Sequence, residues 1–238
     1  MAQTDAIREL AHQAVAVPTL SGKHDTWLWD RTQRLVRNVE HIARLPEITN
    51  SGLSVDRFCL TAAAYFCDAG FARYADPEDP ANRVSLADVS TSDLHDFSTQ
   101  IATEKLTNII PGPKIDKINK IIYESSNRLT KTTEALILAD ARSLDDMGAV
   151  GIFNEFRRYA IHGKSATDAL QSWKRKIDYH YWQTRLDESF NFDTVRELAA
   201  RRFSVAEKFM TQLQLENSAR DLEEMILESL DPLNEKAG

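Results

Sequence analysis

The chain has 238 residues, of which 42% are hydrophobic and 27% are charged, and this balance excludes disordered and collagen-like chains. Its net charge of −7 argues against a nucleic-acid binder, because phosphate contacts usually require a basic face. With 8 glycines and 7 prolines, the chain is poor in the residues that tight turns need, which disfavours a β-rich fold.

Apolar residues recur every three or four positions along most of the chain, and this spacing indicates amphipathic helices. The clearest stripes lie within residues 35–45, 115–122 and 195–213. No repeat and no change of composition marks a boundary between domains. We therefore predict an all-α fold with a single domain over residues 1–238, a core over about 24–215 and an acidic C-terminal helix over about 216–231.

Local signals predict where several of these helices begin and end. Residues 73–93 are rich in Asp, Pro and Ser, which predicts a long loop of the kind that often borders a site, and residues 49–53 predict a short turn. Thr194 and Glu197 have the spacing of a capping box, and Ser165 with Asp168 forms a weaker version after a helix stop at Gly163.

The cysteine content and the lengths of the apolar runs indicate the cellular compartment of the protein. Cys59 and Cys67 are too few for a disulfide framework and lie in an apolar stretch, so we expect reduced, buried thiols. The first residues lack the pattern of a signal peptide, and no apolar run approaches the roughly 20 residues that a membrane span requires. These features predict a cytoplasmic protein with neither membrane nor nucleic-acid partners.

Three segments together resemble the HD superfamily of metal-dependent phosphohydrolases. Residues 31–35 (RTQRL) are similar to the family's opening His-x-x-Arg-Val helix, and residues 62–70 (AAAYFCDAG) resemble the segment that carries its His-Asp pair. Residues 134–152 (EALILADARSLDDMGAVGI) are the most specific, being similar to the family's Asp-Ala-Asp-Arg-Leu-Asp…Gly-Ala-x-Gly segment.

The resemblance covers about residues 24–215, because residues 179–186 and 199–210 also resemble the C-terminal helices of one bacterial branch. It implies a helical bundle around a central metal site, whose ligands are a His, an adjacent His-Asp pair and a distant Asp. Such a metal lowers the pKa of a bound water and polarises a phosphoryl oxygen, while neighbouring basic residues hold the phosphate.

The chain departs from this pattern at the ligand positions. By position, Arg31 replaces the first His and Cys67 replaces the His of the His-Asp pair, so that Asp68 and Asp140 are the ligands that remain. Those two carboxylates are the expected catalytic and metal-binding residues only if a metal binds. A shift of one turn in the first helix would place Leu28, instead of Arg31, at the first position.

Other positions of the expected pocket are also changed. Ser125 stands where many members carry another His, and Arg142 with Ser143 stands where the family usually has Asp and Arg. His95 follows the long loop, close to the position of a further His in some relatives. The resemblance therefore places Ser125, Arg142 and His95 in the pocket.

Arg31 brings a positive charge to the place where the family holds its metal ion. A guanidinium stays charged and pairs with carboxylates through two parallel hydrogen bonds. Two buried carboxylates without a cation would be costly. We therefore hypothesise that Arg31 neutralises Asp68, Asp140 or both.

These residues support three interpretations of function. The first is a degenerate member of the family that needs no cofactor and serves as a non-hydrolytic binding or regulatory module for a small phosphorylated ligand or a protein partner. The second is a phosphohydrolase for a nucleotide or phosphomonoester, which would hold Mn, Mg, Fe or Zn through Asp68, Asp140 and His24 or His95. The third is a structural homodimer formed through the acidic C-terminal helix.

Overall fold

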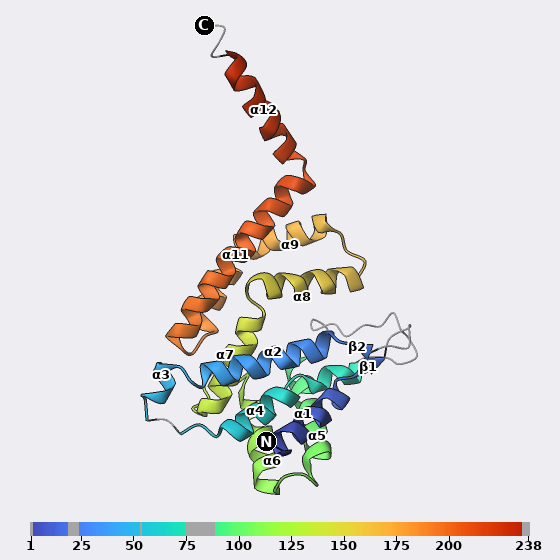
Figure 1. Ribbon diagram of the computed structural model, residues 1–238, viewed down its shortest axis with the longest axis vertical. Helices are drawn as coiled ribbons and strands as arrows, with labels where there is room; N and C mark the ends of the chain where they lie inside the picture. The colour runs from blue at the N-terminus through green and yellow to red at the C-terminus, as the bar shows by residue number, and fades with distance from the viewer. Residues whose placement is uncertain (1, 19–23, 53, 75–88, 235–238) are drawn as a thin grey trace.

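The computed structural model describes residues 2–18, 24–52, 54–74 and 89–234, and the all-α fold is confirmed (Figure 1). Besides its α-helices, this part of the chain holds a 3-10 helix, η1 (Ala69–Tyr74), and one antiparallel pair of two-residue strands, β1 (Val17–Pro18) and β2 (His24–Asp25). The α-helices are α1 (Ala2–Ala14), α2 (Trp27–Ile42), α3 (Pro46–Thr49), α4 (Arg57–Phe66), α5 (Thr91–Leu106), α6 (Gly112–Glu124), α7 (Thr133–Asp145), α8 (Gly148–Ile161), α9 (Ala166–Asp178), α10 (Tyr181–Glu188), α11 (Asp193–Asn217) and α12 (Arg220–Asn234).

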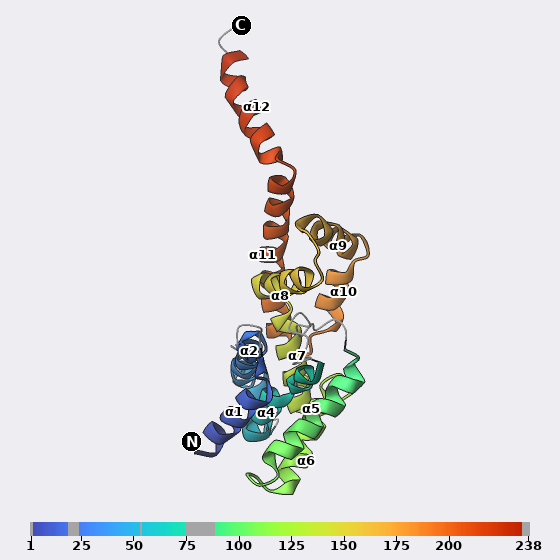
Figure 2. The same ribbon diagram turned by 90° about the vertical axis from the view of Figure 1, so that its right-hand side faces the viewer.

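The helices form a body below and a smaller layer above it, in the orientation of Figure 1. In the body, α2 packs against α4 and α7, α4 packs against α6, and α5 packs against α6 and η1. The layer contains α8, α9 and α10 and is braced by the long helix α11, which packs along α8. Figure 2 shows that α7 leads from the body into this layer, so the turn between α7 and α8 lies where the two parts meet.

Helix α4 forms the centre of the body. Three consecutive alanines, Ala62, Ala63 and Ala64, are buried there, and such small side chains allow neighbouring helices to approach closely. Cys59 and Cys67 are both free thiols and both buried. The tight packing of α4 fixes the position of Asp68, which follows it directly.

The predicted long loop, residues 73–93, falls mostly outside the described residues. Before it, η1 ends at Tyr74, and after it α5 begins at Thr91, with the Ser90 hydroxyl accepting a hydrogen bond from the Asp93 backbone N–H. The predicted turn at 49–53 follows α3, with Gly52 in the left-handed region at φ +72°, while Leu53 lies outside the description.

The two predicted capping boxes have different outcomes. The box of Ser165 and Asp168 is present at the start of α9, and Gly163 adopts φ +64° just beyond α8, as predicted. The box of Thr194 and Glu197 is wrong, because α11 begins at Asp193. The Glu47 carboxylate instead accepts hydrogen bonds from the Asp193 and Thr194 backbone N–H groups, at 2.7 and 3.2 Å.

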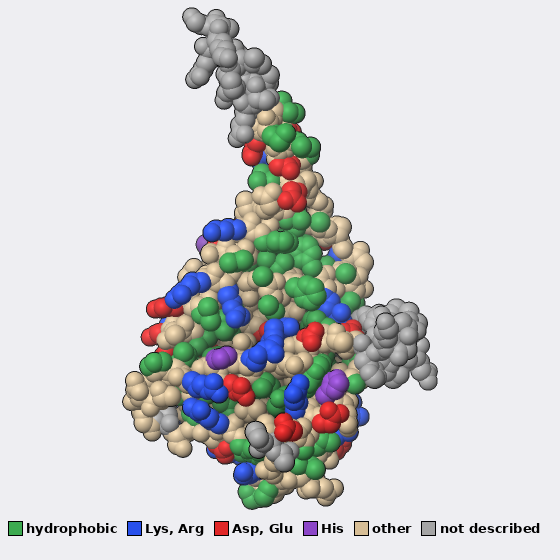
Figure 3. Space-filling view, in the orientation of Figure 1, with side chains coloured by type: hydrophobic (Ala, Val, Ile, Leu, Met, Phe, Trp, Pro, Cys, Tyr) green, Lys and Arg blue, Asp and Glu red, His purple; other side chains and the backbone are tan. Residues whose placement is uncertain are grey.

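The C-terminal helix begins later than predicted, because α11 continues to Asn217 and Ala219, at φ +54°, separates it from α12. Helix α12 projects from the rest of the molecule, and Figure 3 shows apolar and acidic side chains together on it. Leu222, Met225 and Leu227 are more than half exposed. Self-association through this helix stays a prediction. In the described part of the chain, no helix combines the length and apolar character needed to cross a membrane.

Alanine variants of Glu47 and Glu197 test which of the two carboxylates caps the start of α11. We expect Glu47→Ala to lower the free energy of unfolding by about 1 kcal/mol, because two N–H groups at the start of α11 lose their acceptor. Glu197→Ala should change it by less than about 0.5 kcal/mol, since Glu197 is exposed and contacts Arg201 at 3.7 Å. Urea unfolding of both variants measures these values, and equal losses would contradict the assignment.

Candidate functional site

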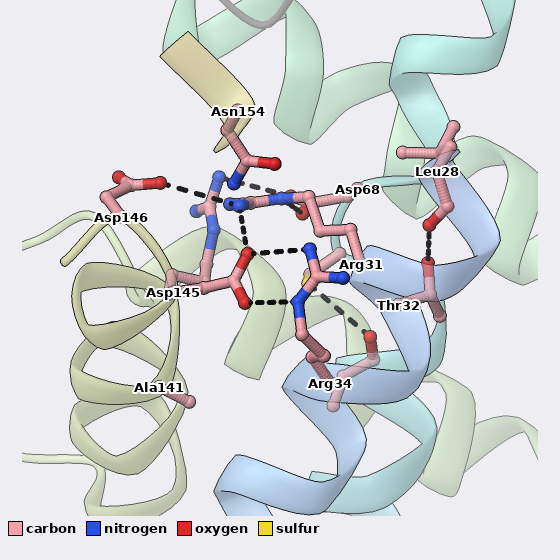
Figure 4. A network of polar contacts seen from close by, with 12 residues as sticks. Leu28, Arg31, Thr32, Arg34, Asp68, Ala141, Asp145, Asp146 and Asn154 are labelled. Atoms are coloured by element: carbon pink, nitrogen blue, oxygen red, sulfur yellow. Dashed lines mark hydrogen bonds and ion pairs between the residues drawn. The ribbon is translucent and has the colours of Figure 1, made fainter. Parts of the chain in front are cut away.

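Arg31 is a charged residue on the buried face of α2, with only 4% of its side chain exposed. Its Nε donates to Asp68 Oδ2 at 2.8 Å, and its Nη1 donates to Asp145 Oδ2 at 2.6 Å and to Asp146 Oδ1 at 3.4 Å (Figure 4). Leu28, one turn earlier, is an apolar core residue whose carbonyl accepts the Thr32 hydroxyl at 2.8 Å. The structure therefore places Arg31, and not Leu28, among the carboxylates.

Asp68 lies between two guanidinium groups. Arg31 contacts one of its oxygens, and Arg142 Nη2 lies 3.3 Å from the other, Oδ1. Burial alone would raise the pKa of Asp68, but the charges of Arg31 and Arg142 and the hydrogen bond from Arg31 hold it below its ordinary value. Asp68 is thus a paired carboxylate ion inside the protein.

Two further carboxylates come from the end of α7. Asp145 is almost fully buried and bridges Arg31 to Arg34, whose Nε donates to Asp145 Oδ1 at 2.8 Å. Asp146 bridges Arg31 to Arg185, at 3.4 and 3.3 Å. Burial opposes the charge on Arg31, yet Asp68 first, and then Asp146 and Asp145, keep its pKa above the ordinary value, so that it stays a cation. We call Arg31, Arg34, Asp68, Arg142, Asp145, Asp146 and Arg185 the Arg–Asp cluster.

Asp140 does not join this cluster. Its carboxylate accepts hydrogen bonds from the Asn191 backbone N–H at 2.9 Å, from Asn191 Nδ2 at 2.7 Å and from the Phe192 N–H at 3.1 Å. Burial raises the pKa of Asp140 to about 6, although these hydrogen bonds oppose the shift. Of the two partners predicted for Arg31, Asp68 is in contact with it and Asp140 is not. Two residues along a helix amount to a turn of about 200°, so Asp140 faces away from Arg142. Its place as the second partner of Arg31 is taken by Asp145.

The other predicted pocket residues have local partners. Cys67 is fully buried with Sγ 3.5 Å from the Ala64 carbonyl oxygen, and burial, with Asp68 beside it, raises the pKa of its thiol. The Ser125 hydroxyl donates to the Ile122 carbonyl at 2.7 Å. His95 is buried, and its Nε2 lies 3.1 Å from the Ser126 hydroxyl.

The residues at the expected metal position do not fit a divalent cation. Both Asp68 oxygens face guanidinium groups, the Cys67 thiol is held neutral, and the Asp140 carboxylate is engaged by Asn191. Among the residues that the structure describes, no three His, Cys, Asp or Glu side chains are grouped to hold a metal ion. His24 is described only through its backbone, which pairs with Pro18 in the strand pair.

Two cavities open on either side of the Arg–Asp cluster, each with a volume of about 300 Å³. The first is bounded by Trp27, α8 and α10, and the second by the segment after α6 and by α7. Six arginines line the two cavities, against three acidic residues, although the whole chain is acidic. These arginines are Arg31, Arg128, Arg142, Arg157, Arg158 and Arg185.

The wall of the first cavity contains buried N–H donors without acceptors. They are Arg142 Nε, Asn154 Nδ2, Arg157 Nε and Trp182 Nε1, none of which has a hydrogen-bond partner in the described part of the chain. A buried donor without an acceptor costs about 1–3 kcal/mol, so four of them around one cavity require an explanation. These nitrogen atoms are closed off from solvent, so an oxygen acceptor of a ligand would reach them only after the lining side chains shift.

Sequence reasoning missed Arg34, Asp145, Asp146 and Arg185 as members of the site. The Asp145-Asp146 pair lies inside the segment that carries the family resemblance, but it was not considered as a partner for Arg31. The signal that could have found it is physical. An arginine on an apolar helix face requires buried carboxylates, and Asp145 follows Arg142 by three residues, which places both on one face of α7.

The buried ion pairs predict that Arg31 contributes much more than Arg34 to the free energy of unfolding. We expect Arg31→Ala to lower the free energy of unfolding by about 3–5 kcal/mol, because Asp68 and Asp145 lose a buried partner. Arg34→Ala should cost no more than about 2 kcal/mol, since Asp145 keeps Arg31. Urea unfolding followed by tryptophan fluorescence tests both, and a near-neutral Arg31→Ala variant would contradict the account.

His95 predicts a pH dependence of stability. Burial and the Arg142 charge lower the pKa of His95 from 6.5 to about 4, so the unfolded chain takes up this proton before the folded chain does. The contribution of neutral His95 is complete above pH 6.5 and is lost as the pH falls towards 4. We expect the free energy of unfolding to drop by on the order of 1–2 kcal/mol between pH 6.5 and pH 4.5, and His95→Gln to flatten this decline.

Solved structures share this fold, while no protein-family model and no curated protein sequence matches the chain. YpgQ from Bacillus subtilis, solved in complex with ADP, is 24% identical, with a TM-score of 0.57 over 90% of this chain and 94% of YpgQ. The Lin1889 protein from Listeria innocua is 23% identical, with a TM-score of 0.57 over 92% and 98% of the two chains. A protein from Lactobacillus plantarum is 19% identical, with a TM-score of 0.58 over the same shares. At these identities the likeness shows a common fold.

Proposed function

We propose that this chain is an HD-domain-like protein that binds a small phosphorylated ligand without hydrolysing it. The ligand binds in the two arginine-lined cavities, which share four lining residues and which we together call the cleft. The observation that carries the proposal is that six arginines and three acidic residues line the two cavities of a chain whose net charge is −7. Four residues of the first cavity also have buried N–H donors without acceptors. Phosphoryl oxygens are strong acceptors, and guanidinium groups bind them through charge-assisted, bidentate hydrogen bonds. An acidic protein that gathers arginines around one cleft therefore favours an anionic ligand there.

The aromatic residues of the first cavity favour a nucleotide as the ligand. Trp27 and Tyr181 line the cavity beside the arginines, and Arg157 already stacks over the Trp27 ring at 4.8 Å. Aromatic rings offer flat, apolar surface for a base, while the arginines serve the phosphates. The ADP complex of the structurally similar YpgQ supports the choice of ADP as the first probe.

The absence of hydrolysis is proposed from the state of the candidate catalytic groups. Asp68 lies between Arg31 and Arg142 with a lowered pKa, which makes it a poor proton acceptor. The Cys67 thiol has a raised pKa and is fully buried, so it is neither a thiolate nor accessible. Asp140 forms hydrogen bonds with Asn191 and Phe192, and it therefore has no role in the cleft.

Calorimetric titration with ADP tests the proposal. We expect ADP to bind with a micromolar Kd and adenosine to bind at least about tenfold more weakly, because adenosine lacks the phosphates. Arg185→Gln, in the cleft, should weaken ADP binding about tenfold, whereas Arg201→Gln, 77% exposed on α11 and outside both cavities, should leave it unchanged.

The same samples test the absence of hydrolysis. We expect no release of phosphate from ADP with Mn²⁺ present. Equal affinities for ADP and adenosine would refute the binding proposal. Phosphate release that Asp68→Asn abolishes would instead favour the metal-dependent phosphohydrolase.

A further inference from the structure

Asp146 differs from the other carboxylates of the Arg–Asp cluster in burial and in bond length. Its side chain is 38% exposed, whereas those of Asp68 and Asp145 are almost fully buried. Its contacts with Arg31 and Arg185 measure 3.4 and 3.3 Å, against 2.8 and 2.6 Å for the contacts of Arg31 with Asp68 and Asp145. Asp146 is therefore the carboxylate that the cluster holds least tightly.

Removing Asp146 from these contacts would leave the rest of the cluster paired. Arg31 would keep its two short ion pairs with Asp68 and Asp145. Arg185, which also donates a hydrogen bond to the Tyr181 hydroxyl at 3.4 Å, would have its Nη2 group released towards the cleft. The cost of displacing this one carboxylate is thus small compared with displacing Asp68 or Asp145.

The backbone of Asp146 is fixed while its side chain borders open space. Gly151 lies so close that a Cβ there would meet the Asp146 carbonyl oxygen at 2.1 Å, which ties this residue to the start of α8. The side chain itself is 38% exposed and lines both cavities, and Figure 4 shows its carboxylate directed toward Arg31. A rotation of the side chain can therefore move the carboxylate without moving the chain.

Asp146 also lies at the junction of the two cavities. The residues that line both cavities are four: Arg31, Arg142, Arg185 and Asp146. The Asp146 carboxylate is thus placed where three guanidinium groups border the space between the cavities. A carboxylate in such a position offers negative charge and oxygen acceptors to the guanidinium groups, as a bound phosphoryl group would.

We propose that a phosphoryl group of the ligand binds at the place of the Asp146 carboxylate, between Arg31, Arg142 and Arg185, and displaces it. This inference rests on the proposed binding function. It adds the position of the phosphoryl subsite and names Asp146 as the group that competes with the ligand for the three arginines. Because the ligand must replace a carboxylate with one negative charge, a phosphoryl group with two negative charges has an electrostatic advantage over a group with one. Asp146 therefore favours doubly charged phosphoryl groups, in a phosphomonoester or at the end of a diphosphate, over singly charged anions.

Asp146→Asn tests this competition, with inorganic pyrophosphate and ADP as probes in calorimetric titration at one fixed salt concentration. The amide keeps the shape of the side chain and removes the competing charge, so we expect affinity for both probes to rise about five- to tenfold. Asp146→Glu keeps the charge and should bind no more tightly than the wild type.

A matched control separates a local effect from a change in net charge. Glu197→Gln also removes one negative charge, but from a side chain on α11 that is 71% exposed and lines neither cavity. We expect its affinities to stay within about twofold of the wild type. A gain equal to that of Asp146→Asn would overturn the inference.

The outcomes distinguish the subsite from the binding function. If Arg185→Gln weakens ADP binding while Asp146→Asn leaves it unchanged or weaker, the binding function stands and the competition is refuted. If neither the wild type nor any variant binds pyrophosphate or ADP, both fail. A crystal structure with pyrophosphate should show the Asp146 side chain rotated away from Arg185, and pyrophosphate bound elsewhere would also overturn the inference.

Discussion

The interaction on which the structure depends is the pairing of the Arg31 guanidinium with Asp68 and Asp145 in the interior. An unpaired charge at this depth would cost many kcal/mol, so the three groups must be assembled together. They come from α2, from the end of α4 and from the end of α7, and their contacts therefore fix how these three helices meet. Arg34 and Arg142 extend the same network to the cluster's edges.

The cluster also explains why an acidic protein has a basic cleft. Four of its members are arginines and three are aspartates, so one positive charge is left over beside the two cavities. Asn154 and Trp182 contribute further buried N–H donors, which carry no charge. The pairing that stabilises the interior and the positive field that attracts an anion thus arise from the same residues.

Periodicity in the sequence predicted the helices well, because burial of one face is a property that the chain carries locally. The capping-box spacing predicted the start of α9, where Ser165 and Asp168 lie three residues apart, and failed at α11, where Glu47 supplies the cap from α3. The same limit applies to the site. The charge of Arg31 and the position of Asp68 predicted their pairing, but the choice of Asp145 over Asp140 depends on which side of α7 faces α2.

The interlocking of these ion pairs constrains how the sequence can evolve. Each buried charge has at least two partners, because Asp68 contacts Arg31 and Arg142, and Asp145 contacts Arg31 and Arg34. Because these partners are shared, the effect of one replacement depends on whether the other partner is still present, and the effects of two replacements are strongly non-additive. A mutational path from this pocket to one lined by neutral or metal-binding side chains passes through unstable intermediates. Such epistasis preserves the arginines and aspartates as a group, independently of any selection on the ligand.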